Sequence, residues 1–283
     1  MKKILFIGGG KMMQAIAGGL IANGWAADGI AAVEPNESTA ADVARLGPTV
    51  FPSAAAALDG LANVGIIVLA VKPQVIREAL HPFVGKITSS QLIISIAAGL
   101  RLGDLRDWLD GGTGCMQSAQ MVRAMPNTPA LIQQGITGLY AAPNLTASGR
   151  HDAAQLLGAV GKVVWFDDES MLDAVTAVSG SGPAYVFYFL EALESAAREL
   201  GFSDDAAREF ARQTFVGSIH LACESEASPA TLRANVTSPH GTTEAAIAIF
   251  DEAQLKAQFI RGVRAAASRA QALGNELSAA KPC

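Results

Sequence analysis

The stretch with the clearest chemical potential lies at residues 235–246, where a proline and a glycine stand among small hydroxyl residues. An amphipathic helix is predicted to follow at once, with Thr242, Thr243 and Glu244 in or near its first turn. The first N–H groups of a helix have no partner inside it, and the helix dipole favours an anion there. The stretch therefore suits a small anionic ligand, although an ordinary helix cap would carry the same residue types.

A second stretch of chemical interest opens the chain, where residues 3–7 are predicted to form a buried strand. Gly8, Gly9 and Gly10 then predict a turn, and residues 11–23 predict a helix because their apolar residues recur at four-residue spacing. A strand, a glycine-rich turn and a helix form the dinucleotide-binding fingerprint, in which the helix start receives the pyrophosphate. The alternative is a plain turn of an α/β domain that binds nothing.

Other predicted strands also end in residues that suit a ligand. Glu34 follows the strand at residues 30–33, and an acidic residue at this place commonly binds ribose hydroxyls. Lys72 follows the apolar strand at residues 64–71, and small residues follow the strand at residues 92–96. Ligands of open parallel sheets lie at such carboxyl ends. Lys72 is expected either to contact a cofactor phosphate or ribose, or to be solvated.

The remaining elements divide the chain into two parts. Further strands are predicted at residues 121–125, 137–141 and 163–166, with a helix at 147–160. After Asp167 only helices are predicted, at residues 171–178 and 183–200, after Ser203, and at 253–273. We therefore predict an α/β protein with an N-terminal Rossmann-type dinucleotide-binding domain at residues 1–165 and an all-α domain at 166–275. Residues 276–283 are expected to form a disordered tail.

Composition narrows the function classes. The chain has 283 residues, half of them hydrophobic, and a net charge of −5 without a basic stripe, so nucleic acid is not an expected partner. It has no apolar run long enough for a membrane span, so no membrane partner is expected. Cys115, Cys223 and Cys283 are odd in number and far apart, which argues against a disulfide framework or a zinc site and fits a cytoplasmic protein. The histidines show no metal-ligand spacing, so no metal is expected.

Six blocks, in order along the chain, resemble the pyrroline-5-carboxylate reductase family of proline biosynthesis. They are FIGGGKM at 6–12, LAVKP at 69–73, SIAAG at 95–99, RAMPNTP at 123–129, SGSGPAY at 179–185 and NVTSPHGTTEAA at 235–246. The resemblance implies an NAD(P)H-dependent oxidoreductase acting on a CH–NH bond, which reduces 1-pyrroline-5-carboxylate to L-proline in the last step of that pathway. It also implies a helical domain like that of 6-phosphogluconate dehydrogenase. This domain would make a homodimer, or a larger homo-oligomer of dimers, with the substrate site at the interface.

The site residues follow by position in these blocks, with Glu34 added from the fingerprint. The candidate cofactor-binding residues are Gly8, Gly9, Gly10, Lys11, Met12, Glu34, Ala70, Val71, Lys72, Pro73, Ala97, Ala98, Gly99 and Asn235. The candidate substrate-binding residues are Glu226, Gly241, Thr242 and Thr243. The catalytic hypothesis is that the Thr243 hydroxyl hydrogen-bonds the imine or product-amine nitrogen. Tyr185 is an alternative general acid, but a tyrosine at a helix start more often packs.

Three residues depart from the family pattern. His240 stands where the family usually has glycine, Lys11 replaces a more usual Asn or Gln and suits a phosphate, and Met13 replaces a smaller residue of the fingerprint. Glu34 would repel an adenosine 2′-phosphate, which favours NADH, whereas the family tendency is NADPH. We take NADPH as the expected cofactor and NADH as the alternative.

Two other functions share parts of this pattern. A β-hydroxyacid-type NAD(P) dehydrogenase needs a catalytic lysine on the first helices of the second domain, and residues 171–200 contain no lysine. A non-catalytic dinucleotide-binding regulator would tolerate a degenerate substrate loop, but here the loop at residues 235–246 matches the family apart from His240.

Overall fold

The computed structural model describes residues 2–112, 114, 116 and 119–279. The chain forms two compact units. The first unit joins Met1–Ser181 to Ala266–Cys283, and the second is Gly182–Ala265. The boundary between the two units therefore follows Ser181, later than the predicted boundary after residue 165.

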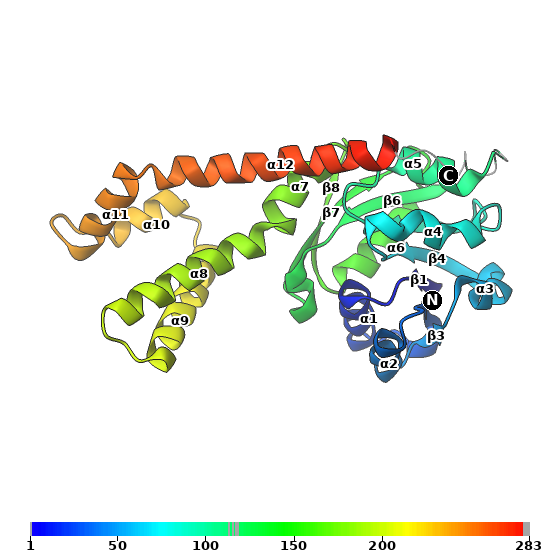
Figure 1. Cartoon of the computed structure of the whole chain (residues 1–283), viewed down its shortest axis with the longest axis horizontal. Helices are drawn as coiled ribbons and strands as arrows, with labels where there is room; N and C mark the ends of the chain where they lie inside the picture. Colours follow the sequence, from blue (N-terminus) through cyan, green and yellow to red (C-terminus); the bar gives the residue numbers. More distant parts are fainter. Residues whose placement is uncertain (1, 113, 115, 117–118, 280–283) are drawn as a thin grey trace. The chain divides into compact units, whose positions relative to one another are not determined.

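The first unit is built on one sheet of eight strands in the order β3-β2-β1-β4-β5-β6-β7-β8 (Figure 1). The strands are β1 (Lys3–Ile7), β2 (Ile30–Val33), β3 (Thr49–Phe51), β4 (Val64–Leu69), β5 (Leu92–Ser95), β6 (Gln120–Met125), β7 (Gly135–Ala141) and β8 (Gly161–Phe166). Strands β1 to β6 run parallel, β7 is antiparallel to β6, and β8 is parallel to β7. The carboxyl ends of β1, β2, β4 and β5 therefore meet at one edge of the sheet.

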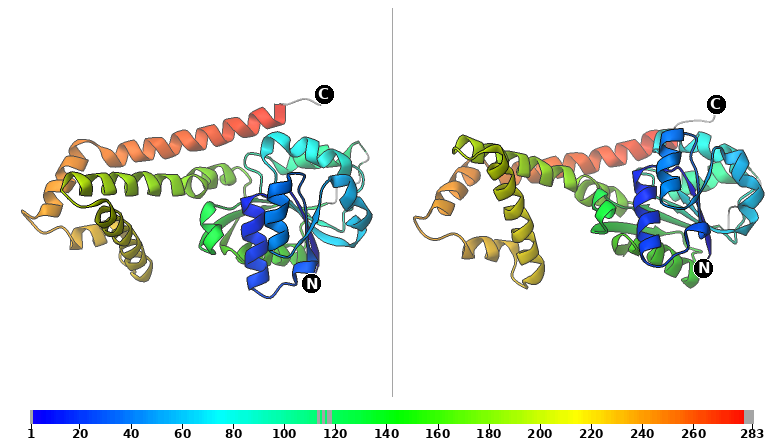
Figure 2. Two further views of the ribbon diagram at one scale, coloured as in Figure 1. Left: turned by 60° about the horizontal axis from the view of Figure 1, so that its bottom comes forward. Right: turned by 90° about the horizontal axis from the view of Figure 1, so that it is seen from below.

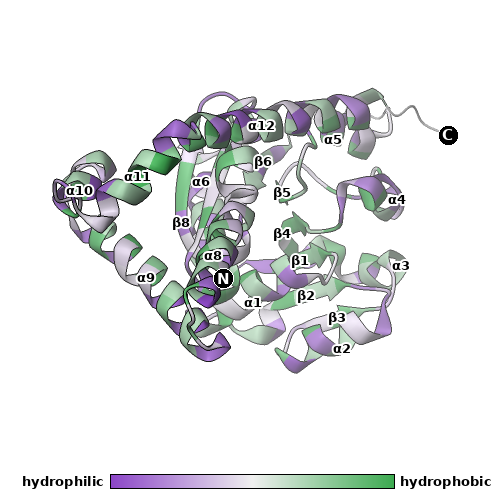
Figure 3. Ribbon diagram, turned by 60° about the vertical axis from the view of Figure 1, so that its left-hand side comes forward, coloured by the Kyte–Doolittle hydropathy of each residue, from purple (hydrophilic) through white to green (hydrophobic). Residues whose placement is uncertain are grey.

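The apolar strands are buried on both faces, as near-continuous hydrophobic runs predict for a parallel sheet. Ile4 and Phe6 belong to one core, with α1 (Lys11–Ala22), α2 (Glu37–Arg45) and α6 (Ala147–Gly158). Leu5 and Ile7 belong to the other core, with α3 (Ala54–Ala57), α4 (Ile76–Leu80) and α5 (Leu102–Asp110). Figure 2 shows α1 and α2, in dark blue, on the same face, and Figure 3 shows the hydrophobic character of β1 and β4. Because side chains alternate between the two faces of a strand, successive residues of β1 pack against different helix layers.

Most predicted elements of this unit are present, whereas β3 and the helices α2, α3, α4 and α5 were missed. The strands at residues 3–7 and 30–33 have the predicted bounds, whereas β4 ends two residues earlier than predicted, at Leu69. Strand β3 was missed because it has three residues, none of them buried. Helices α2 and α5 were missed because they are short and polar, and α2 buries only Val43.

The later boundary has a packing reason. Helix α7 (Met171–Val175) packs against β6 and β7, where a Cβ on Gly138 would lie 2.9 Å from Val175 Cγ1. The chain continues into one π-helical turn, Thr176–Gly180, and a Cβ on Gly180 would lie 2.7 Å from the Met125 methyl carbon. Residues 166–181 therefore belong to the sheet-containing unit.

The end of the chain also differs from its prediction. Helix α12 (Leu255–Ala279) includes residues 276–279, so a disordered tail from residue 276 was wrong for these four residues. Ser278 donates a hydrogen bond to Asp104 over 2.6 Å, and Arg101 donates to Asn275 over 2.7 Å. Long-range hydrogen bonds that the local sequence does not reveal thus hold the helix end. Residues 280–283 lie outside the described chain.

The second unit is all helical, as predicted, with α8 (Gly182–Glu199), α9 (Asp204–Glu224), α10 (Pro229–Asn235), α11 (Thr242–Glu252) and the start of α12. The Ser203 hydroxyl caps α9 by accepting from the Ala206 N–H at 3.3 Å. Phe259 of α12 packs between Tyr185 and Phe189 of α8, at ring distances of 5.6 and 5.8 Å.

A single copy of the second unit has almost no core. Within residues 182–265 only Ala207 and Ala211 are buried. Large apolar side chains stay exposed, including Phe187 at 63% and Phe210 at 63%. Exposed apolar surface on this scale marks an interaction surface.

Candidate functional site

The glycine loop after β1 lies against the loop after β4. Gly8 has a left-handed backbone with φ of 104°, and a Cβ there would lie 2.9 Å from the Ala70 carbonyl oxygen and 2.8 Å from Val71 Cγ1. The Ala70 N–H donates to the Ile7 carbonyl over 2.8 Å. The strand order reverses between β1 and β4, which is the switch point where open α/β sheets bind ligands. The structure therefore brings together Gly8, Ala70 and Val71, three of the predicted cofactor residues.

Glu34 is held inside this loop. Its Oε2 accepts from the Gly9 N–H and its Oε1 from the Asn36 N–H, both at 2.9 Å. The side-chain amide of Gln14 donates to the Gly9 carbonyl, also at 2.9 Å. Gly9 is thus fixed from both sides, and a Cβ there would lie 3.0 Å from Glu34 Cβ.

The start of α1 offers an uncapped helix end. Gly10 is its N-cap residue, makes no side-chain cap hydrogen bond, and has no acidic residue after it in the first turn. A Cβ on Gly10 would meet no neighbouring atom within 4 Å, apart from adjoining residues. Open space before a positive helix end, with glycines that permit close approach, fits the pyrophosphate of a dinucleotide.

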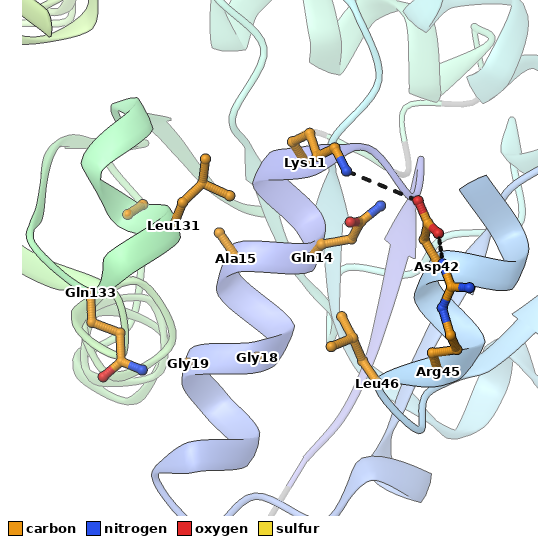
Figure 4. Close-up of a pocket in the computed structure, with 11 residues that line it drawn as sticks. Lys11, Gln14, Ala15, Gly18, Gly19, Asp42, Arg45, Leu46, Leu131 and Gln133 are labelled. Atoms are coloured by element: carbon orange, nitrogen blue, oxygen red, sulfur yellow. Dashed lines mark hydrogen bonds and ion pairs between the residues drawn. The ribbon is translucent and has the colours of Figure 1, made fainter. Parts of the chain in front are cut away.

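Lys11 and Met12 begin this helix. Met12 is half-buried and packs against the core under α1. The Lys11 side chain is exposed, and its Nζ lies 4.0 Å from Asp42 Oδ2. Asp42 also pairs with Arg45, as Figure 4 shows.

A cavity of about 550 Å³ lies along the outer side of α1 (Figure 4). Its lining includes Gln14, Asp42, Arg45 and Gln133. Among the described residues that line it, only Lys11 is a predicted cofactor-binding residue. We therefore place the candidate cofactor site at the carboxyl edge of the sheet, where the predicted residues gather, rather than in this cavity.

The remaining sheet-edge candidates follow β4 and β5. Lys72 is exposed at the start of a 3-10 turn that begins with Pro73. The Ile96 N–H donates to the Leu69 carbonyl over 3.1 Å, so the loop after β5 begins beside the end of β4. Ala97 and Gly99 are buried, and Ala98 is half-buried.

Helix α12 supports the loop after β5. Gly99 has φ of 76°, and its carbonyl oxygen would lie 3.0 Å from a Cβ on Gly274 of α12. A glycine at each position lets the two backbones approach closely. The final turns of α12 therefore help to set the position of Ala97, Ala98 and Gly99.

A charge cluster around the buried Arg123 supports the same edge from β6. Arg123, 2% exposed, pairs with Asp173 at 2.8 Å and with Glu169 at 3.5 Å. Glu169 also accepts from the Leu102 N–H at 2.8 Å, at the start of α5. Next to this cluster, the pKa of Asp168 is lowered because Ser170 donates to its carboxylate from both hydroxyl and backbone N–H.

The candidate substrate stretch has the helix start that the sequence predicts. Helix α11 begins at Thr242 after the N-cap residue Gly241, which makes no side-chain cap hydrogen bond. A Cβ on Gly241 would lie 3.0 Å from the Ser238 carbonyl oxygen, so the turn favours glycine. Thr242 is exposed and Thr243 is half-buried. The backbone amides at this helix start are therefore suited to an anion.

His240 takes a backbone conformation that glycine adopts more readily than other residues. Its φ is 60°, in the left-handed region where histidine is tolerated more often than most side chains. Its N–H donates to the Glu244 carboxylate over 2.6 Å. The turn is thus kept despite the substitution.

Glu226 and Asn235 are the other candidates from the second unit. Both are exposed; Glu226 lies between α9 and α10, and Asn235 ends α10. The cofactor-binding role of Asn235, which belongs to the second unit, stays a prediction. Tyr185, the alternative acid, packs edge-on against Phe259.

Two residues that shape the site were not singled out from the sequence. Asn36 donates its N–H to Glu34 and caps α2 by accepting from the Thr39 N–H at 2.9 Å. Gln14 holds the Gly9 carbonyl. Asn36 has the sequence signal of an N-cap residue, whereas nothing in the local sequence marks Gln14.

The described chain shows no metal site and no membrane span. Within it, no three His, Cys, Asp or Glu side chains are grouped to hold a metal ion. None of its helices is both long enough and apolar enough to cross a membrane.

Comparison with known proteins identifies the family. Residues 169–273 match the sequence profile described as pyrroline-5-carboxylate reductase dimerisation, and residues 3–99 match that described as NADP oxidoreductase, coenzyme F420-dependent. A pyrroline-5-carboxylate reductase of Pseudomonas aeruginosa is 41% identical over 275 residues, which cover 97% of this chain and 98% of that protein.

Solved structures agree over the same length. A pyrroline-5-carboxylate reductase of Coxiella burnetii superposes with a TM-score of 0.83 at 35% identity, covering 96% of this chain and 98% of the other. The Plasmodium falciparum enzyme, solved with NADP bound, has the same TM-score and coverage at 27% identity. The chain belongs to the pyrroline-5-carboxylate reductase family.

Proposed function

We propose that the residues described above carry out the reaction of the family. The chain is an NAD(P)H-dependent oxidoreductase that reduces 1-pyrroline-5-carboxylate to L-proline. The observation that carries this conclusion is the 41% identity to the Pseudomonas aeruginosa enzyme over nearly the whole of both chains. No observation favours a β-hydroxyacid dehydrogenase or a non-catalytic regulator.

The first unit holds the dinucleotide. The amides at the start of α1 bind its pyrophosphate, and Gly8 keeps the loop free of a side chain beside Ala70 and Val71. Lys72 and Pro73 continue the site after β4, and Ala97, Ala98 and Gly99 line it after β5. The bound reduced nicotinamide supplies the hydride. NADPH, the cofactor that the resemblance favours, is supported by the NADP-bound relative and by Lys11, whereas Glu34 supports NADH.

The second unit holds the substrate. The ring carboxylate binds the amides of Thr242 and Thr243 at the start of α11, and Gly241, whose own N–H donates to the Ser238 carbonyl over 3.0 Å, keeps the approach to them free of a side chain. The Thr243 hydroxyl hydrogen-bonds the ring nitrogen. Protonation of that nitrogen makes the imine carbon a better hydride acceptor, and orientation of the two reactants supplies much of the catalysis. Glu226 is proposed to lie near the substrate, and Asn235 is proposed to contact the cofactor.

The assembly is a homo-oligomer. The dimerisation profile covers the helical unit, and that unit leaves large apolar side chains exposed in one chain. A homodimer, or a larger assembly built from dimers, is the proposed form. A cytoplasmic location is proposed because the three cysteines are few and far apart.

One assay tests the function. Purified protein is mixed with 1-pyrroline-5-carboxylate and either NADPH or NADH, and the loss of reduced-nicotinamide absorbance is followed together with L-proline formation. Proline formation with at least one cofactor is the expected result. A correctly assembled protein that turns over neither cofactor would reject the proposal.

A further inference from the structure

We infer that Glu34 makes this enzyme select NADH over NADPH, an inference that rests on the proposed dinucleotide site. Glu34 stands at the carboxyl end of β2 with both carboxylate oxygens bound to backbone N–H groups. One of those groups, on Gly9, belongs to the glycine loop itself. The carboxylate is therefore part of the cofactor loop rather than a free surface charge.

The position of the carboxylate is fixed. Gly9 is buried, so its N–H has Glu34 as a hydrogen-bond partner in place of water. A rotation of Glu34 away from the loop would leave this buried donor without that partner, which is unfavourable. The Asn36 N–H holds the second oxygen, and Asn36 is itself fixed as the cap of α2. Glu34 cannot yield to an incoming phosphate without breaking both hydrogen bonds.

The free lone pairs of this carboxylate suit a ribose and oppose a phosphate. An ionised carboxylate has about four acceptor sites and no donor, and the two backbone groups occupy two of them. Ribose hydroxyls can donate to the sites that remain, as they do to the acidic residue of NAD-binding folds. An adenosine 2′-phosphate carries negative charge and oxygen acceptors, so it meets like charge at the same place.

Neighbouring charges do not offset this repulsion. Residues 34–38 contain Glu34 and Glu37 and no lysine or arginine. Lys11 and Arg45 both have Asp42 as their ion-pair partner (Figure 4). Throughout the described chain, Glu34 forms no ion pair with a cationic side chain. This charge pattern favours NADH, against the NADPH expectation that rests on the resemblance, the NADP-bound relative and Lys11.

The test compares E34Q with the control E37Q. E34Q removes the charge while keeping the size of the side chain and an acceptor oxygen. E37Q removes one carboxylate of the same short segment, which is exposed in the first turn of α2. Dissociation constants for NADH and NADPH are measured on each assembled protein by energy transfer from tryptophan to the nicotinamide. The ratio of kcat/KM for the two cofactors is measured in parallel.

The wild type is expected to bind NADH at least about tenfold more tightly than NADPH. E34Q should reduce this ratio by about tenfold, mainly through tighter NADPH binding, and E37Q should keep it within about twofold. A wild type that binds NADPH as tightly as NADH would overturn the inference, whether or not E34Q folds. The inference would also be overturned if E34Q and E37Q showed the same ratio of NADH to NADPH binding.

The outcomes also separate this inference from the proposed function. Binding of neither dinucleotide would refute both the cofactor site and the inference. Selective NADH binding without proline formation would refute the proposed reaction and leave the inference supported.

Discussion

At the scale of single residues, the proposed chemistry rests on groups whose backbone settings are unusual. Gly241 is the N-cap residue before α11, and His240 before it takes a left-handed backbone to form the turn. Histidine is tolerated in that backbone region more often than most side chains, which explains why the loop accepts it. The same turn presents Thr242 and Thr243 at a helix start.

Thr243 provides the residue-scale prediction. T243A should lower kcat/KM for 1-pyrroline-5-carboxylate by about 10- to 100-fold, because a hydrogen bond to a charged partner is lost. T243S keeps the hydroxyl and should stay within about threefold of the wild type. Steady-state kinetics with saturating cofactor measures both variants. Normal turnover and normal substrate KM in T243A would show that the hydroxyl has no such role.

At the scale of elements, the cofactor edge depends on parts of the chain that are remote in sequence. The final turns of α12 pack on the loop after β5, and Arg123 of β6 joins Glu169 and Asp173 around α7. Neither arrangement contributes an atom to the proposed chemistry. Both fix the loops that do.

The contact between α12 and the loop after β5 predicts opposite effects for two glycine-to-alanine changes. A Cβ on Gly274 would lie 3.0 Å from the Gly99 carbonyl oxygen, whereas a Cβ on Gly18 in α1 would meet nothing within 4 Å. G274A should therefore lower the free energy of unfolding by about 1 kcal/mol or more and raise the KM for the dinucleotide. G18A should raise that free energy by up to about 1 kcal/mol.

Urea denaturation followed by tryptophan fluorescence measures both glycine variants, because Trp25, Trp108 and Trp165 all lie in the first unit. Equal stabilisation by the two changes would contradict a close contact at Gly274.

The charge cluster around Arg123 predicts a larger loss. R123M leaves the partly buried Glu169 and Asp173 carboxylates without their cation, so the free energy of unfolding should fall by about 1.5–3 kcal/mol. R208M removes the ion pair between Arg208 and Asp205, whose carboxylate is 96% exposed. This change should alter the free energy of unfolding by less than about 0.5 kcal/mol. The same urea titration compares them. An equally small loss of unfolding free energy in R123M and R208M would show that the cluster does not stabilise the fold.

At the scale of the whole molecule, the two units differ in how their apolar residues are buried. The first unit has a core on each face of its sheet, and the second buries only two alanines within one chain. The second unit therefore needs another copy to cover Phe187, Phe210 and their neighbours. Self-association follows from this deficit and from the dimerisation profile.

Assembly gives the whole-molecule prediction. F187E or F210E should weaken self-association by at least about tenfold, because a charge would be buried without a partner. The control I132E changes a 72% exposed side chain of the first unit and should leave the assembly intact. Sedimentation velocity measures the association, and turnover per chain should fall with it. Intact assemblies in both phenylalanine variants would place the interface elsewhere.

The sequence by itself determined the alternating strands of the sheet, the glycine turn after β1, the start of α11 and the family. These features follow from local backbone preferences and hydrophobic periodicity, which a short stretch of chain contains in full. Only the tertiary structure decided that the Glu34 carboxylate binds the Gly9 N–H, 25 residues away in the chain. It also decided that residues 166–181 and the end of α12 belong with the sheet. Contacts of this kind depend on how distant segments pack, and no local pattern specifies them.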